Sequence, residues 1–290
     1  MLSQQILNGL LASGIYALFA VGFTMIFGIM GVLNMAHTDF AMAAALAIVW
    51  AVSAGVAPLP AVMMAVIVTV GIALTVERFA MRPGRRFKGE AAIEMPLIAT
   101  IGAGMVLQNG AALLFGNKVI FFPWHLPAFM NVGGYLVSQG LLISAVAAVI
   151  LLVLLELMVA RTSFGRQIRA VAQNPNAAKI MGINTNRVIV TTVALTAALA
   201  GIAGALVGLS YGFVAPLMGI PYAIKGLVAM IIGGVGSLRG AALGAVLIGV
   251  VEAVAVTYFG SQTKDFAVFA VLLAVLVIRP GGLVATPGAR

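Results

Sequence analysis

Long apolar stretches separated by short polar segments dominate the sequence. A helix needs about 20 mostly apolar residues to span the hydrocarbon core of a bilayer. By that measure the chain contains nine candidate spans, at residues 6–33, 40–57, 59–79, 95–115, 139–160, 188–212, 223–238, 240–259 and 264–279. The runs are too continuous for the alternating strands of a membrane barrel, so we expect helices. Because residues 223–238 form a short run that could be a re-entrant half-helix, we expect eight or nine membrane segments.

Composition supports a membrane protein and excludes other classes. Apolar residues make up 63% of the 290 residues and charged residues 8%, against about 25% charged in a typical globular domain. So few charges cannot cover a soluble protein, and a mean hydropathy of +1.18 is far too high for a disordered chain. The absence of cysteine excludes disulfides and cysteine-ligated metals. We therefore predict an all-α, polytopic membrane helix bundle, folded as a single domain over residues 1–290.

The distribution of basic residues predicts the orientation. Lys and Arg number 16, against 7 Asp and Glu. Most of the basic residues fall in three polar places: Arg78, Arg82, Arg85, Arg86 and Lys88; Arg161, Arg166, Arg169, Lys179 and Arg187; and Arg279 and Arg290. Cytoplasmic loops carry the Lys and Arg excess. We therefore expect the loops at about 80–94 and 161–187 to be cytoplasmic and the loop at about 116–138 periplasmic, with a periplasmic N-terminus and a cytoplasmic C-terminus. A nucleic-acid partner is not expected, because no soluble domain is present to carry one.

The first polar interruption lies between two apolar runs, at residues 31–40, and contains Asn34, His37 and Asp39. A carboxylate at the bilayer centre costs about 2.5–3.5 kcal/mol. Asp39 must therefore sit at an interface, line a wet cavity or be neutralised by a neighbour such as His37. The alternative is a polar loop at the cytoplasmic surface in which Asp39 caps the next helix. Metal binding is not expected, because His125 and the remaining acids have no ligand spacing.

The second interruption is the glycine-rich run at residues 233–240. Inside a membrane segment such a run bends or breaks a helix, and discontinuous helices are a common way for transporters to build a pathway near the midplane. The alternative is a short turn between two spans. The sequence has no phosphate-binding loop of the Gly-x-x-x-x-Gly-Lys-Ser/Thr type, so we do not expect this chain to bind and hydrolyse ATP by that machinery.

The third interruption is the basic loop at residues 161–187, which is long enough for one or two short helices. Pro175 is well placed to start a helix that Asn174 caps, and Gly182 to end it. The segment 177–181 would then form a short exposed helix, suited to insertion into a cleft on another protein. Association with the lipid surface is the alternative.

These motifs resemble those of branched-chain amino-acid ABC importer permeases. The resemblance rests on the segment Gly28 to His37, on the glycine run 233–240 followed by Gly244, and on Leu107-Gln108 before Leu114-Phe115-Gly116. It extends over roughly residues 5–283 and is strongest to the shorter of the two permease subunits of such systems. Met35 stands where the family has an aromatic residue and Thr38 where it has glycine, so the resemblance specifies the class more firmly than the cargo.

The resemblance implies a non-catalytic permease subunit in the bacterial inner membrane, without catalytic residues or a cofactor of its own. Its implied partners are two cytoplasmic ABC ATPase subunits that bind the ATP, a second permease subunit in a heterodimer, a periplasmic substrate-binding protein and the lipid bilayer. The implied ATPase-coupling loop contains Arg166, Arg169, Ala177, Ala178, Gly182 and Ile183. The implied translocation pathway contains Asn34, His37, Asp39, Gly233, Gly234, Gly236 and Ser237. The implied cargo is a branched-chain or related hydrophobic amino acid, although related permeases also handle urea and short amides.

An ion-coupled secondary transporter or channel for a small polar solute is the alternative function. In that case Asp39, His37 or Glu252 would carry a proton, because ionisable residues inside a membrane are functional candidates. The basic loop discriminates between the two hypotheses, since a secondary carrier has no reason to present a docking helix that ends at a glycine.

Overall fold

The computed structural model describes residues 2–87, 89–124, 126 and 129–284. Lys88, His125 and Arg290, considered above, lie outside these residues. The helices are α1 (Leu2–Met30), α2 (His37–Ser53), α3 (Pro58–Val76), α4 (Arg82–Gly84), α5 (Ala91–Phe115), α6 (Gln139–Arg161), α7 (Ser163–Gln173), α8 (Pro175–Ile180), α9 (Thr185–Tyr211), α10 (Gly219–Gly233), α11 (Leu238–Phe259) and α12 (Lys264–Ile278). A π-helical turn, Glu77–Met81, joins α3 to α4, and a 3₁₀ turn, Ser261–Thr263, precedes α12.

The helices confirm the predicted membrane bundle. Seven helical segments in the described part of the chain are long and apolar enough to cross a bilayer, and two shorter apolar helices, α2 and α10, accompany them. Seven and two make nine segments, in agreement with the expected eight or nine. Each lies within a few residues of a predicted span.

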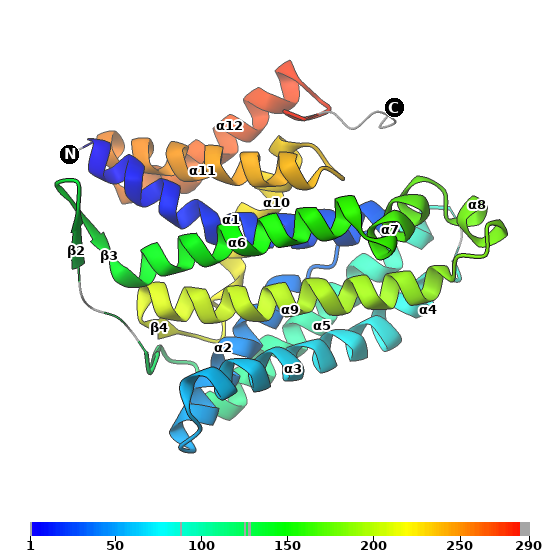
Figure 1. Cartoon of the computed structure of the whole chain (residues 1–290), viewed down its shortest axis with the longest axis horizontal. Coiled ribbons are helices and arrows are strands. Elements are labelled where there is room, and N and C mark those ends of the chain that lie inside the picture. The colour runs from blue at the N-terminus through cyan, green and yellow to red at the C-terminus, as the bar shows by residue number, and fades with distance from the viewer. Residues whose placement is uncertain (1, 88, 125, 127–128, 285–290) are drawn as a thin grey trace.

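The bundle is built around α1 and α9, which are the most buried of the long helices. Helix α1 packs against α11, α10, α9 and α6, while α3, α5 and α12 lie at the periphery with mostly exposed apolar side chains (Figure 1). Lipid offers no hydrophobic driving force for helix association, so small residues must allow close backbone approach. At Gly204 in α9 an added Cβ would collide with the backbone of Ala41 in α2.

Two small antiparallel sheets lie in the connections. Strand β1 (Ile120–Phe121) pairs with β4 (Phe213–Val214), and β2 (Phe129–Val132) forms a hairpin with β3 (Tyr135–Ser138). The β1–β4 pair joins the segments that follow α5 and α9, and the backbone N–H of Phe122 donates to the Gly212 carbonyl at 2.9 Å. Hydropathy did not predict these strands, because they lie outside the apolar runs.

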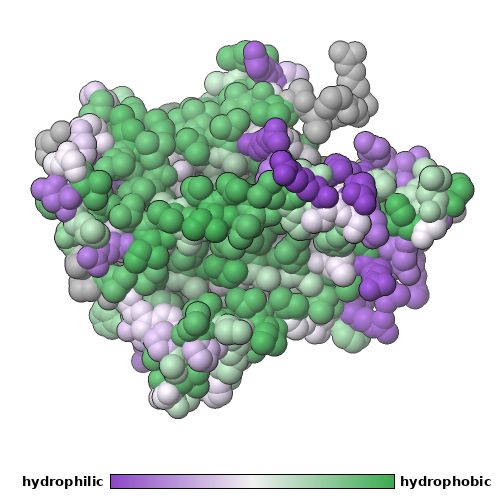
Figure 2. Space-filling view, viewed as in Figure 1, coloured by the Kyte–Doolittle hydropathy of each residue, from purple (hydrophilic) through white to green (hydrophobic). Residues whose placement is uncertain are grey.

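The two ends of the bundle differ in charge. Helices α7 and α8 lie at one end, and the β2–β3 hairpin and the start of α1 lie at the other. Basic residues gather at the α8 end, where hydrophilic surface surrounds the projecting tip of the chain (Figure 2). In the described part of the chain these are Arg78, Arg82, Arg85, Arg86, Arg161, Arg166, Arg169, Lys179, Arg187, Arg239 and Arg279. The polar end that contains the predicted coupling loop is therefore the basic end.

Candidate functional site

The predicted coupling loop folds into two capped helices. Thr162 caps α7, since its Oγ1 accepts from the Gly165 N–H at 3.1 Å. Asn174 caps α8, accepting from the N–H groups of Asn176 and Ala177 at 3.0 Å each. Gly182 ends this turn with φ of +83°, a left-handed conformation that favours glycine. The predicted start, cap and stop of the short helix are all confirmed.

The apolar tip of α8 is exposed. Ile180 is 87% and Met181 81% exposed, although both are large apolar residues at the polar end of the bundle. Ala177 is also exposed, whereas Ala178 is only 3% exposed and its carbonyl accepts from the Ile183 N–H at 3.0 Å. Within the predicted segment 177–181, Ala178 is therefore the residue that is turned away from solvent. The large exposed apolar side chains of the segment are those of Ile180 and Met181, which the resemblance did not single out. A role of this segment in ATPase coupling stays a prediction.

Basic side chains lie on α8 and on the two helices that flank it in the chain. Arg166, Lys179 and Arg187 are exposed on α7, α8 and α9. Arg169 is exposed as well, and its guanidinium donates to the Val159 carbonyl near the end of α6. Carbonyls in the last turn of a helix lack intrahelical partners, so this contact fastens α7 to the membrane span before it.

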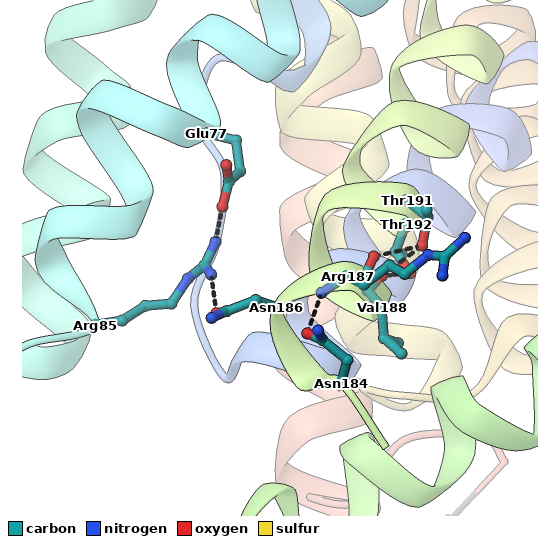
Figure 3. Close-up of polar contacts among 8 residues, drawn as sticks. All are labelled: Glu77, Arg85, Asn184, Asn186, Arg187, Val188, Thr191 and Thr192. Carbon is teal, nitrogen blue, oxygen red and sulfur yellow. Dashed lines mark hydrogen bonds and ion pairs between the residues drawn. The ribbon is translucent and has the colours of Figure 1, made fainter. Parts of the chain in front are cut away.

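A second contact fastens the loop after α4 to the start of α9 (Figure 3). Arg85 forms an ion pair with Glu77 in the π-helical turn and also donates to Asn186 Oδ1 at 3.3 Å. Asn184 caps α9, accepting from the Arg187 N–H at 3.0 Å. Sequence reasoning did not select Glu77 or Asn186, because their relation to Arg85 depends on the folded chain. Together these contacts brace both ends of the predicted coupling loop.

The polar residues of the first interruption lie inside the bundle. Asn34, His37 and Asp39 are all buried, with Asp39 only 4% exposed. The Met35 N–H donates to Thr100 Oγ1 at 3.2 Å, in the middle of α5, so the chain returns into the bundle before α2 begins. Asp39 is the third residue of α2, and its side chain makes no capping bond there. The alternative, a polar loop at the cytoplasmic surface in which Asp39 caps the next helix, is therefore wrong.

Asp39 is the member of this group that faces a cavity. It lines a space of about 210 Å³ between α2, α5 and α10, together with Thr38 and Gln108. Gln108 Nε2 donates to Asp39 Oδ1 at 2.9 Å. Helix α10 begins beside it, since an added Cβ on Gly219 would lie 3.2 Å from Asp39 Oδ1. Two short helices thus start next to each other at a buried carboxylate, where their N-terminal dipoles favour negative charge.

His37 and Asn34 have different surroundings. The His37 ring lies between Phe19, Phe23 and Phe40, with centroid separations of 5.0 to 6.5 Å. Asn34 Oδ1 accepts from the Ala36 N–H at 3.2 Å and so shapes the turn before α2. Both are fully enclosed, so in this conformation neither lines the Asp39 cavity.

The glycine run forms a turn between α10 and α11 and does not break a helix. Gly234 and Gly236 have φ of +105° and +88°, and Ser237 caps α11 by accepting from the Gly240 N–H at 3.0 Å. The segment after α12 returns to this turn, with the Val284 N–H donating to the Gly233 carbonyl at 3.0 Å. The run lies at the opposite end of α10 from Asp39, so the two predicted halves of the pathway are not brought together. The pathway role of Gly233, Gly234, Gly236 and Ser237 stays a prediction.

The sequence raises two further questions: a metal site, which it does not favour, and a proton carrier at Glu252. No cluster of three His, Cys, Asp or Glu that could hold a metal ion occurs among the residues that the structure describes. Glu252, the third proton-carrier candidate, is paired with Lys225, with 2.7 Å between Oε1 and Nζ.

Comparison with known proteins shows the family of this chain. A family model described as "Branched-chain amino acid transport system / permease component" matches residues 5–276. The permease BraD of Pseudomonas aeruginosa, from a high-affinity branched-chain amino acid transport system, is 36% identical over 298 residues, covering 98% of this chain and 96% of the relative. The permease LivH of Escherichia coli is 33% identical over 302 residues, at the same coverage. A probable LivH of Methanocaldococcus jannaschii is 27% identical, covering 97% and 92%. The chain therefore belongs to the family of permease components of branched-chain amino acid transport systems.

Proposed function

We propose that this chain is the transmembrane permease of an ABC importer that takes up branched-chain or related hydrophobic amino acids. ATP is hydrolysed by two separate cytoplasmic subunits, and the chain has no catalytic role or cofactor. A second permease subunit completes the pathway, and a periplasmic binding protein delivers the amino acid. Binding of these partners stabilises outward-open and inward-open states differently, which drives alternating access.

The exposed tip of α8 is the observation that carries this proposal. Ile180 and Met181 project from the basic end, where a lipid-facing role is disfavoured by the surrounding polar surface. An apolar knob within a polar rim is typical of the centre of a protein–protein interface. The caps at Asn174 and Gly182 hold the knob in place, so a force on the knob reaches α7 and α9.

The orientation follows from the same charges. The positive-inside rule supports a cytoplasmic basic end. Counting α2 and α10 as crossings beside the seven long helices, we propose a periplasmic N-terminus and a cytoplasmic C-terminus. The protein then lies in the bacterial inner membrane with its β2–β3 hairpin facing the binding protein.

The proposal is tested by reconstituting the chain with the other subunits of its transport system. Burying an isoleucine side chain contributes about 1.5–3 kcal/mol, so Ile180→Asp is expected to weaken ATPase binding about tenfold or more. Leucine uptake should fall in parallel. Ile180→Leu retains the apolar area and is the matched control, with uptake near that of wild type. Uptake that persists without ATPases would instead support the ion-coupled alternative, and normal uptake by Ile180→Asp would exclude α8 as the docking element.

A further inference from the structure

A cavity of about 680 Å³ lies at the N-terminal end of the bundle, opposite α8. We call it the N-terminal cavity. Its walls come from α1, α6, α9, α10 and α11, with the β2–β3 hairpin and the start of α12 at its rim. Its polar lining includes Asn8, Tyr16, Tyr222, Lys225, Glu252 and Lys264. Its volume is in the range of small-molecule sites, which are typically about 300–1,000 Å³.

Three side chains from three helices meet in this cavity. Lys225 Nζ lies 2.7 Å from Glu252 Oε1, and Tyr16 Oη donates to Glu252 Oε2 at 2.9 Å. Lys225 Nζ also donates to Tyr16 Oη at 3.0 Å and lies 4.7 Å from the centre of the Tyr16 ring. The three groups form a closed triangle of one cation, one anion and one hydroxyl, each about one-tenth exposed or less.

A buried ion pair such as Lys225–Glu252 contributes little to stability if its only role is to hold helices together. Lys225 is the one charged residue of α10, and a buried ion pair is often no more stable than apolar residues of the same volume. Ionisable groups within membrane segments generally serve a pathway or a ligand. This pair is not sealed in the core, because both groups line the cavity wall.

We propose that the N-terminal cavity binds the zwitterionic head group of the transported α-amino acid, with Lys225 and Tyr16 taking its carboxylate and Glu252 its ammonium. The inference rests on the proposed import function. A ligand that carries one group of each sign replaces the internal pair with two new pairs, so no net charge is buried. Tyr222 also lines the cavity, and its ring centre lies 6.2 Å from that of Tyr16.

The rest of the cavity suits an aliphatic side chain. Apolar residues of four helices line it beside the polar triangle: Ala12, Leu141, Val207 and Val256. A site with a few converging polar groups on an apolar wall fixes the orientation of a small ligand. The hairpin residues at its rim place the cavity at the end that receives cargo under the proposed orientation.

The test is uptake of radiolabelled leucine by the complete reconstituted importer, at saturating leucine-loaded binding protein. The double variant Lys225→Met with Glu252→Gln removes both charges and leaves neither unpaired. We expect its uptake to fall at least tenfold, while the ATPase subunits still co-purify with the complex because the proposed docking surface on α8 is unchanged. The matched control neutralises a second ion pair, that of Arg239 and Glu156 at 2.8 Å, through Glu156→Gln with Arg239→Met, and should transport normally.

Uptake by the double variant within twofold of wild type would overturn the inference and leave the import function intact. Wild-type uptake that does not depend on ATP would instead overturn the proposed function. A second measurement covers a variant that does not assemble: competition for leucine binding to the wild-type complex without binding protein. Valine should compete, whereas 4-methylpentanoate, which lacks the ammonium, and isoamylamine, which lacks the carboxylate, should compete at least tenfold less well. Equal competition by all three, or no saturable binding, contradicts the site.

Discussion

The crossing of α1 and α11 gives the sharpest test of the packing. Gly9 and Gly249 face each other there, and an added Cβ on either would collide with the carbonyl oxygen of the other. The same Cβ would lie 2.8 Å from a second side chain, that of Ala253 for Gly9 and that of Ser13 for Gly249. Backbone atoms cannot rotate away as a side-chain end can, so the helices themselves must separate. Overpacking of this kind costs about 1–3 kcal/mol.

The variant Gly249→Ala is therefore expected to lower the thermal unfolding midpoint of the detergent-solubilised protein by several degrees, at about 2–4 °C per kcal/mol for a chain of this size. Gly9→Ala should act similarly. The double variant should cost less than the sum of the two, because the second methyl enters a gap that the first has opened. Gly102→Ala is the matched control: Gly102 lies in the exposed face of α5, and an added Cβ meets no atom within 4 Å. Better helix propensity should make it neutral or stabilising by up to about 1 kcal/mol. An unchanged midpoint for Gly249→Ala, or an equal loss for Gly102→Ala, would refute the reasoning.

Two further predictions concern the polar contacts. Asn174→Ala removes both hydrogen bonds that cap α8. We expect the loss to destabilise this helix by about 0.5–2 kcal/mol, which should be seen as faster proteolysis of residues 174–182 and weaker ATPase binding. Gln173→Ala, at the exposed neighbouring position, is the control. Gln108→Leu leaves the Asp39 carboxylate without its amide donor, which should cost about 1–3 kcal/mol in thermal unfolding. The adjacent Asn109→Ala, whose side chain bonds only to its own helix at Met105, should have a smaller effect, and an equal effect would show that the Gln108 contact is not special.

The sequence predicted the spans and the caps well, for a local reason. Hydropathy over about 20 residues and the cap at Asn174 are both properties of neighbouring residues, and both were confirmed. The contacts that shape the cavities are not local. Tyr16 and Glu252 lie 236 residues apart and Asp39 and Gln108 lie 69 apart, so no window of sequence contains both partners.

The glycine run illustrates a different limit. A cluster of glycines marks a place where the backbone departs from the helix, but it does not distinguish a break within a span from a turn between spans. Here the turn is held by hydrogen bonds from residues far along the sequence: the N–H groups of Leu283 and Val284 donate to the carbonyls of Ile232 and Gly233. Likewise, the sequence predicted the short helix α8 and its cap, but the burial of Ala178 depends on residues beyond the helix, since the Ile183 N–H donates to the Ala178 carbonyl.

Helix α10 connects the Asp39 cavity, the N-terminal cavity and the glycine turn before α11. Its first residue lies beside Asp39, Lys225 in its middle pairs with Glu252, and its last residue accepts a hydrogen bond from the segment after α12. The hydrogen bonds within a helix couple its residues, so a displacement of α10 along its axis would alter the Lys225–Glu252 pair and the wall of the Asp39 cavity together. A ligand that separates Lys225 from Glu252 would remove one restraint on such a displacement. Cargo in the N-terminal cavity can then bias the position of α10, as the proposed alternating access requires.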